Sequence, residues 1–180
     1  MILFPEEVHC SRSMNKLIRR MEWKVKVNSR FDEVIDQCAE LREQSGTWIT
    51  LSMRDAYCEL HEQGFAHSIE VYEQQQLIGG LYGVSLGRIF FGESMFTLKS
   101  GASKVAFITM ARWLKQRHFP LIDCQIANRH LTSLGAREIE RVDFEAQLSE
   151  SINPELITNE NSTWRAASNK VISKDGHLLD

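Results

Sequence analysis

The feature that most constrains the fold is a strand-rich run at residues 67–96, HSIEVYEQQQLIGGLYGVSLGRIFFGESMF. Turn-forming residues at 73–76 and 86–87 divide this run, so it predicts three consecutive strands of an antiparallel meander. Its five glycines weaken strand propensity and indicate bulges, or a ligand that approaches the backbone closely. The following segment, SKVAFITMARWLKQR (103–117), has the apolar spacing of an amphipathic helix.

Shorter patterned segments flank this unit. They predict a basic helix at 11–21, an alternating strand at 23–27, helices at 31–44 and 52–63, a short strand at 120–126, and short helices at 127–136 and 143–150. The apolar stripe of the second helix includes Leu41, and Ser52 with Asp55 predicts a capping box for the third. This order predicts an α+β fold in which a central mixed, mostly antiparallel sheet is flanked by helices.

Length and composition are those of one ordinary globular domain. We place this domain at residues 1–150 of the 180, followed by a polar C-terminal tail at 151–180 that we expect to be partly ordered. The apolar content of 43% and charged content of 25% exclude a wholly disordered chain. No apolar run reaches the roughly 20 residues of a membrane helix, and the start does not resemble a signal peptide. We therefore expect a cytoplasmic protein with no membrane partner and with reduced cysteines.

Charge is unevenly distributed although the net charge is only −3. Residues 9–30 hold seven bases and one acid, whereas residues 31–73 hold ten acids and two bases. Such a split can provide one face for a polyanion and another for a cation, or simply two solvated faces. Under the first interpretation, the candidates for contacts to nucleic-acid phosphates are Arg12, Lys16, Arg19, Arg20, Lys24 and Lys26.

Seven segments together resemble one enzyme family, the bacterial leucyl/phenylalanyl-tRNA–protein transferases. They are GTWIT (46–50), YCELHEQGFAHSIEV (57–71), IGGLYGV (78–84), FFGESMF (90–96), ASKVA (102–106), LIDCQ (121–125) and SLGAREI (133–139). The resemblance implies a GNAT-like N-acetyltransferase fold. It also implies transfer of Leu or Phe, and Met less well, from aminoacyl-tRNA to the α-amine of proteins that begin with Arg or Lys, which feeds N-end rule degradation.

The resemblance extends from about residue 3 to about residue 148. Family members carry a smaller N-terminal domain before the position of Phe4-Pro5, so we expect this chain to correspond to the C-terminal catalytic domain without it. In the family, the N-terminal domain helps to hold the terminal adenosine of the tRNA, so the absence of this N-terminal domain would put full activity in doubt.

Asp123 and Gln125 are the candidate catalytic residues. Because they lie two residues apart on a predicted strand, their side chains are expected on one face, with Ile122, Cys124 and Ile126 on the other. An aminoacyl ester is already activated, so its aminolysis requires no ATP, metal or other cofactor. Asp123 can accept hydrogen bonds from the amine, and Gln125 can link the amine to the ester. The resemblance implies catalysis at both. Alternatively, Asp123 caps a turn and Gln125 hydrogen-bonds a sheet edge.

A pocket for Leu, Phe and Met needs apolar, adaptable walls. Candidates are Leu81, Phe90, Met95, Phe107 and Met110, with Gly92 as a position of close ligand approach. The resemblance implies pocket roles for Phe90, Met95 and Leu81, whereas plain core packing is the alternative. Glu93 lies in an apolar strand, so its carboxylate must be paired or near solvent. It either recognises a substrate cation or forms a structural pair.

Two other functions remain open. An acyl-CoA-dependent acetyltransferase would share the fold, but such enzymes usually place a Gln/Arg-x-x-Gly-x-Gly/Ala turn before the helix that follows the meander. The stretch here, FTLKSGASKVA, has a single glycine at Gly101, which argues against CoA. The other possibility is a non-catalytic module that binds tRNA ends or Arg/Lys N-termini.

Overall fold

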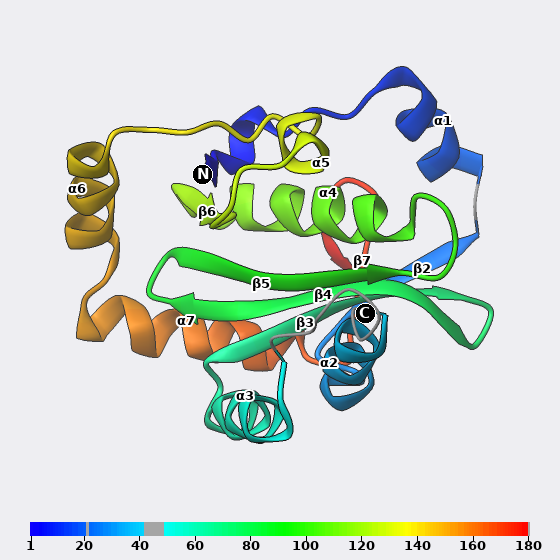
Figure 1. The fold of residues 1–180 in the computed structure, drawn as a ribbon, viewed down its shortest axis with the longest axis horizontal. Coiled ribbons are helices and arrows are strands. Elements are labelled where there is room, and N and C mark those ends of the chain that lie inside the picture. Colours follow the sequence, from blue (N-terminus) through cyan, green and yellow to red (C-terminus); the bar gives the residue numbers. More distant parts are fainter. Residues whose placement is uncertain (21, 42–48, 180) are drawn as a thin grey trace.

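The computed structural model describes residues 1–20, 22–41 and 49–179, and these form an eight-stranded sheet of order β1-β6-β5-β4-β3-β2-β7-β8 (Figure 1). The strands are β1 (Ile2–Leu3), β2 (Trp23–Val27), β3 (Ala66–Glu73), β4 (Gln76–Leu86), β5 (Ile89–Thr97), β6 (Leu121–Asp123), β7 (Val171–Ile172) and β8 (Leu178–Leu179). The helices are the short 3₁₀ turn η1 (Pro5–Glu7) and α1 (Arg12–Arg20), α2 (Phe31–Glu40), α3 (Leu51–Gln63), α4 (Ala102–Lys115), α5 (Arg129–Thr132), α6 (Arg141–Ser151) and α7 (Pro154–Ala167).

The predicted meander forms the centre of this sheet. β3, β4 and β5 pair antiparallel through two tight turns, and the chain then runs through α4 to β6, which lies parallel to β5. Gly79 allows α4 to approach β4, because a Cβ at this glycine would lie 2.5 Å from the Cβ of Ala102. The predicted α+β fold with a mostly antiparallel sheet is therefore confirmed.

Helices cover both faces of the sheet. Figure 1 shows α4 above the central strands and α2 and α3 beneath them. On the α4 side, Ile69 of β3 and Leu81 of β4 join one apolar cluster, whereas Phe31 of α2 and Tyr82 of β4 belong to a second cluster on the other side. Alternate residues of each strand therefore supply two separate cores. Among the described residues, no helix has the length and apolar character needed to cross a membrane.

The two edges of the sheet contain elements that the sequence did not reveal. β1 pairs antiparallel with β6 at one edge, although a two-residue strand is too short to carry a periodic pattern. At the other edge β7 pairs with β2, and β8 with β7. The segment expected as a C-terminal tail thus contributes α7 and two strands to the structure.

Two local expectations were wrong. α2 ends at Glu40, and Leu41 is 50% exposed rather than part of the buried apolar stripe. Residues 42–44 of the predicted helix lie outside the described residues. The N-cap of α3 is Thr50, whose hydroxyl accepts the N–H of Met53 at 3.3 Å, and not Ser52 in a capping box. Either hydroxyl could have capped this helix, and the sequence pattern did not distinguish them.

A buried carboxyl group joins β3 to the start of α2. One oxygen of Glu70 accepts the backbone N–H groups of Ser29 at 3.0 Å and Arg30 at 3.3 Å, and the hydroxyl of Ser68 at 2.6 Å. Burial nevertheless raises the pKa of Glu70 to about 7 from 4.5. Between pH 4.5 and about pH 7, Glu70 is therefore protonated to a greater extent in the folded protein than in the unfolded chain. The contribution of Glu70 to the free energy of unfolding falls as the pH rises through this range.

Glu70→Gln is expected to remove that pH dependence. The difference in free energy of unfolding between this variant and the parent should shift by about 3 kcal/mol between pH 4.5 and 7.5, in favour of the variant at the higher pH. Urea denaturation at several pH values measures it, and taking the difference cancels the other titrating groups. A difference that stays constant with pH would contradict the role assigned to Glu70.

Candidate active site

The site begins where β5 and β6 separate. Their parallel pairing ends at Phe91 and Asp123, whereas β5 continues to Thr97 with β4 as its partner on the other side. The strand predicted at 120–126 therefore has only three residues, Leu121–Asp123. The early end of β6 opens the sheet beside the second half of β5.

A side-chain hydrogen bond ends β6. Oδ1 of Asp123 accepts the backbone N–H of Gln125 at 2.8 Å, and Gln125 adopts the left-handed conformation with φ of 58°. A short acidic side chain that bonds the N–H two residues on competes with strand pairing, which explains the turn. The prediction that Asp123 and Gln125 share one face of a strand is therefore wrong.

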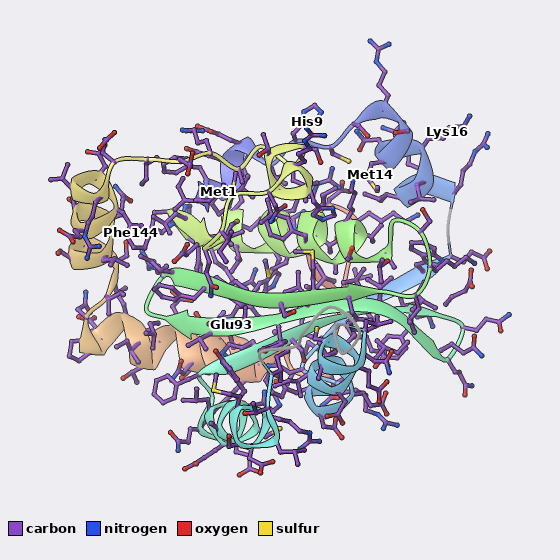
Figure 2. The ribbon with its side chains drawn as sticks, viewed as in Figure 1. Met1, His9, Met14, Lys16, Glu93 and Phe144 are labelled. Carbon is purple, nitrogen blue, oxygen red and sulfur yellow. The ribbon has the colours of Figure 1, made fainter. Side chains whose placement is uncertain are left out.

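A bulge in β5 places Glu93 beside this turn. Tyr82 of β4 pairs with Ser94 and Gly83 pairs with Gly92, so Glu93 is the additional residue between them. Figure 2 shows Glu93 over the central strands. Its Oε2 accepts a hydrogen bond from Nε2 of Gln125 at 3.0 Å. Because a carboxylate can only accept, the amide of Gln125 is oriented with its Oε1 available to another donor.

Tyr57 of α3 supports Glu93 from the opposite face of the sheet. Burial, together with the charge of Glu93 and a side-chain hydrogen bond to it, raises the pKa of the Tyr57 hydroxyl. The neutral phenol and the Gln125 amide therefore hold the Glu93 carboxylate between them. Sequence analysis missed Tyr57, because no spacing rule connects a residue of α3 to one on β5. Of the two roles considered for Glu93, this geometry favours a structural pair that positions Gln125.

A cavity of about 620 Å³ occupies the opening between β5 and β6. It is lined by every catalytic and substrate-binding residue predicted from the sequence: Leu81, Phe90, Gly92, Glu93, Met95, Phe107, Met110, Asp123 and Gln125. The two ends of this cavity differ. Leu81, Phe90, Phe107 and Met110 are buried, whereas Gln125 is exposed. The cavity thus has a closed apolar end and a polar mouth, as is common in sites for small ligands.

The turn after Asp123 also changes the neighbours of Gln125. Cys124 and Ile126 were expected on the apolar face of a strand, but both line the cavity, and Ile126 is 77% exposed at its mouth. Burial, with the nearby Asp123, raises the pKa of the Cys124 thiol to about 12. A thiol with so high a pKa is a poor nucleophile, so the site is not suited to covalent catalysis at Cys124.

The predicted phosphate-binding residues lie apart from the cavity and divide into two groups. Arg12, Lys16, Arg19 and Arg20 belong to α1, which packs beside the start of α4 through Leu17. Figure 2 shows Lys16 at the periphery of the molecule. Lys24 and Lys26 instead project from the opposite face, since Val25 and Val27 of the same strand point into the α4-side core. The structure therefore does not join all six into one surface.

Comparison with known proteins identifies the family. The model of a family described as leucyl/phenylalanyl-tRNA protein transferase matches residues 2–149. The relative of that name from Pseudomonas entomophila is 53% identical over 153 residues, which cover 84% of this chain and 68% of the relative. The chain belongs to this family. The Flavobacterium johnsoniae member is 50% identical over 146 residues, or 80% of this chain and 69% of its own length.

The region shared with the transferase family includes the whole cavity, since all of its lining residues fall between Leu81 and Leu131. Among solved structures, an aminoglycoside N-acetyltransferase in complex with CoA aligns with a TM-score of 0.47 and 16% identity, over 67% of this chain and 91% of that chain. A likeness of this extent carries no argument about the activity of this chain.

Proposed function

We propose that this chain transfers Leu or Phe, and Met less well, from aminoacyl-tRNA to the α-amine of cytoplasmic proteins that begin with Arg or Lys. The observation that carries the proposal is one cavity with a buried apolar end and with Asp123, Gln125 and Glu93 at its mouth. Membership of the transferase family supports the reaction class.

The apolar end suits the side chain of the transferred amino acid. Leu81, Phe90 and Phe107 provide fixed walls, and Met95 and Met110 add flexible thioethers that adapt to Leu, Phe or Met. Shape alone discriminates by only about 1–3 kcal/mol for a misfit the size of a methylene group. Several similar apolar side chains are therefore expected to be accepted with graded efficiency.

The polar mouth suits the incoming amine. With Nε2 of Gln125 bonded to Glu93, Oε1 of Gln125 can accept a hydrogen bond from the amine. Asp123 can stabilise the positive charge that develops on the amine nitrogen as it attacks the ester. An α-amine has a pKa of about 8, so orientation is the main requirement. The amine nitrogen bonds to the ester carbon, the bond to the tRNA 3′-oxygen breaks, and the amine proton passes to that oxygen. Orientation alone can lower the barrier by several kcal/mol.

The basic residues of α1 are proposed to bind the phosphate backbone of the tRNA. Such contacts would be largely independent of sequence and would weaken with added salt. Lys24 and Lys26 would contribute only if the tRNA also reached the opposite face of β2.

The test is transfer of radiolabelled Leu and Phe from charged tRNA to a peptide that begins with Arg. A peptide that begins with Asp and the variant Asp123→Ala are the controls. Label should reach only the Arg peptide and only with the parent protein. Salt-sensitive tRNA binding without transfer would favour the non-catalytic module, and turnover of acetyl-CoA without either would favour the acetyltransferase.

A further inference from the structure

The C-terminal segment lies outside the region that the family model matches, which ends at residue 149. The last part of this segment is a hairpin of β7 and β8, and β7 also pairs with β2 at the edge of the sheet. No residue of the hairpin takes part in the proposed function. Its turn nevertheless contacts α1, the helix to which we assign contacts with the tRNA backbone.

The turn of the hairpin is fixed against α4. Nη1 of Arg112 donates a hydrogen bond to the carbonyl oxygen of Lys174 at 2.6 Å. One turn of helix further on, Nε2 of Gln116 donates to the carbonyl oxygen of Asp175 at 2.8 Å. Gly176 has a φ of 93°, and a Cβ at this position would lie 2.6 Å from the backbone carbonyl carbon of Arg112. Only a glycine permits so close an approach, so the turn has a defined position on α4.

From this turn, the side chain of Lys174 reaches the C-terminal end of α1. Its Nζ donates a hydrogen bond to the backbone carbonyl oxygen of Arg19 at 3.3 Å. The last carbonyl groups of a helix lack partners within the helix and carry partial negative charge, so a lysine is favourable there. An ammonium group has three N–H donors, and this contact uses one of them. Because Lys174 is exposed, the remaining donors are available to a ligand in solution.

The contact places Lys174 beside cations that have no internal partner. The basic side chains of α1 are all exposed, and among the described residues none of them forms an ion pair: Arg12, Lys16, Arg19 and Arg20. Residues 9–20 contain no acid. Asp175 follows Lys174 in the turn, but its carboxylate pairs with none of these bases in the described structure. Like charges gathered in this way repel one another, and a polyanion supplies the missing partner.

We propose that the C-terminal hairpin forms part of the tRNA-binding surface, with Lys174 adding a phosphate contact beside those of α1. This inference rests on the proposed function, because the partner is the tRNA whose backbone α1 would bind. It extends that surface to a segment that the family model does not include. Phosphate contacts carry no sequence information directly, so Lys174 would add affinity for every tRNA rather than select among tRNAs.

Lys174→Gln is the test, with Lys174→Arg and Lys170→Gln as matched controls. Glutamine keeps an N–H group that can donate to the Arg19 carbonyl but has no charge, whereas arginine keeps both. Lys170 is another exposed base of the C-terminal segment, and it precedes β7 instead of lying in the turn. Its replacement therefore removes the same charge at a different place. The readout is equilibrium binding of uncharged tRNA to the full chain between about 50 and 200 mM salt.

We expect Lys174→Gln to reduce the slope of log K against log salt by about 0.7–0.9, the share of one phosphate contact. Binding should weaken about tenfold at the lower salt and about fourfold at the higher, since the counterion contribution vanishes near 1 M salt. The melting temperature should equal that of the parent protein. Lys174→Arg should keep the parent slope, and Lys170→Gln should stay within about 0.2 of it.

Three results would overturn this assignment. A parent slope in Lys174→Gln would mean that Lys174 only caps α1. An equal fall in slope in Lys170→Gln would mean that net charge, and not this contact, controls binding. A reduced slope in Lys174→Arg would show that the positive charge is not the cause. A parent protein that binds tRNA without transferring Leu or Phe would defeat the proposed transfer alone, because the slopes still test Lys174. A parent protein that does not bind tRNA would overturn both.

Discussion

Asp123→Asn is expected to lower kcat/KM for aminoacyl transfer by about a hundredfold or more without destabilising the protein. Oδ1 of Asp123 accepts the backbone N–H of Gln125 at 2.8 Å, and the amide oxygen of asparagine can accept the same bond. The turn and the left-handed conformation of Gln125 should therefore persist. What the substitution removes is the negative charge proposed to face the incoming amine.

The variant Asp123→Ala separates the two roles of this residue. It removes both the charge and the hydrogen bond that ends β6, so it should lose transfer and also lose about 0.5–1.5 kcal/mol of stability. Steady-state transfer assays and thermal melts of both variants provide the comparison, with tRNA binding as a check that the substrate still docks. If Asp123→Asn retained full activity, Asp123 would form the turn and contribute nothing to the reaction.

Local patterns were sufficient to predict the centre of the fold. The meander and α4 follow from alternation, turn residues and helical spacing within single segments, so no knowledge of distant contacts was needed. Phe107 and Met110 of α4 were predicted to line the cavity from their apolar, adaptable side chains, whereas the family resemblance implied the pocket roles of Phe90 and Met95 of β5.

The details of the site depend on interactions that such patterns do not encode. Alternation predicted a strand through Gln125, but the carboxylate of Asp123 competes for the backbone N–H and ends the strand early. The bulge at Glu93 depends on register with β4, and the contact between Glu93 and Tyr57 crosses the sheet. Both arise only when distant segments are brought together, so the sequence predicted which residues form the site better than it predicted their geometry.

The C-terminal segment, residues 151–180, also makes contacts with distant segments that local sequence patterns do not encode. Its polar composition predicted a partly ordered tail, and Trp164 of α7 in this segment is fully buried. The Trp164 ring stacks on His67 with centroids 4.2 Å apart, and it meets the edge of Trp113 at 4.4 Å. It also lies 5.7 Å from Phe90, which lines the cavity. One aromatic residue in a polar helix is a weak sequence signal, but the side chain of Trp164 contributes a large buried area.

These contacts lead us to propose that α7 belongs to the same folding unit as residues 1–150. Trp164→Ala should then reduce the free energy of unfolding of the whole chain by about 3–5 kcal/mol, since truncation of a buried tryptophan leaves a cavity. For a chain of this size, that corresponds to a melting temperature lower by about 10 °C. Urea denaturation and thermal melts measure the two quantities. Leu179→Ala is the control, because that side chain is 49% exposed and its loss should have little effect.

The result also determines where the functional unit ends. A destabilised Trp164→Ala variant with a single unfolding transition would mean that residues 1–150 depend on α7, so that a fragment ending at residue 150 would fold poorly. The Trp164→Ala variant should also transfer Leu and Phe less efficiently, because the Phe90 wall of the cavity loses the Trp164 ring that lies behind it. If the main transition and the transfer activity were both unchanged, residues 151–180 would be a separate tail, and the contacts of Trp164 would contribute little to the catalytic domain.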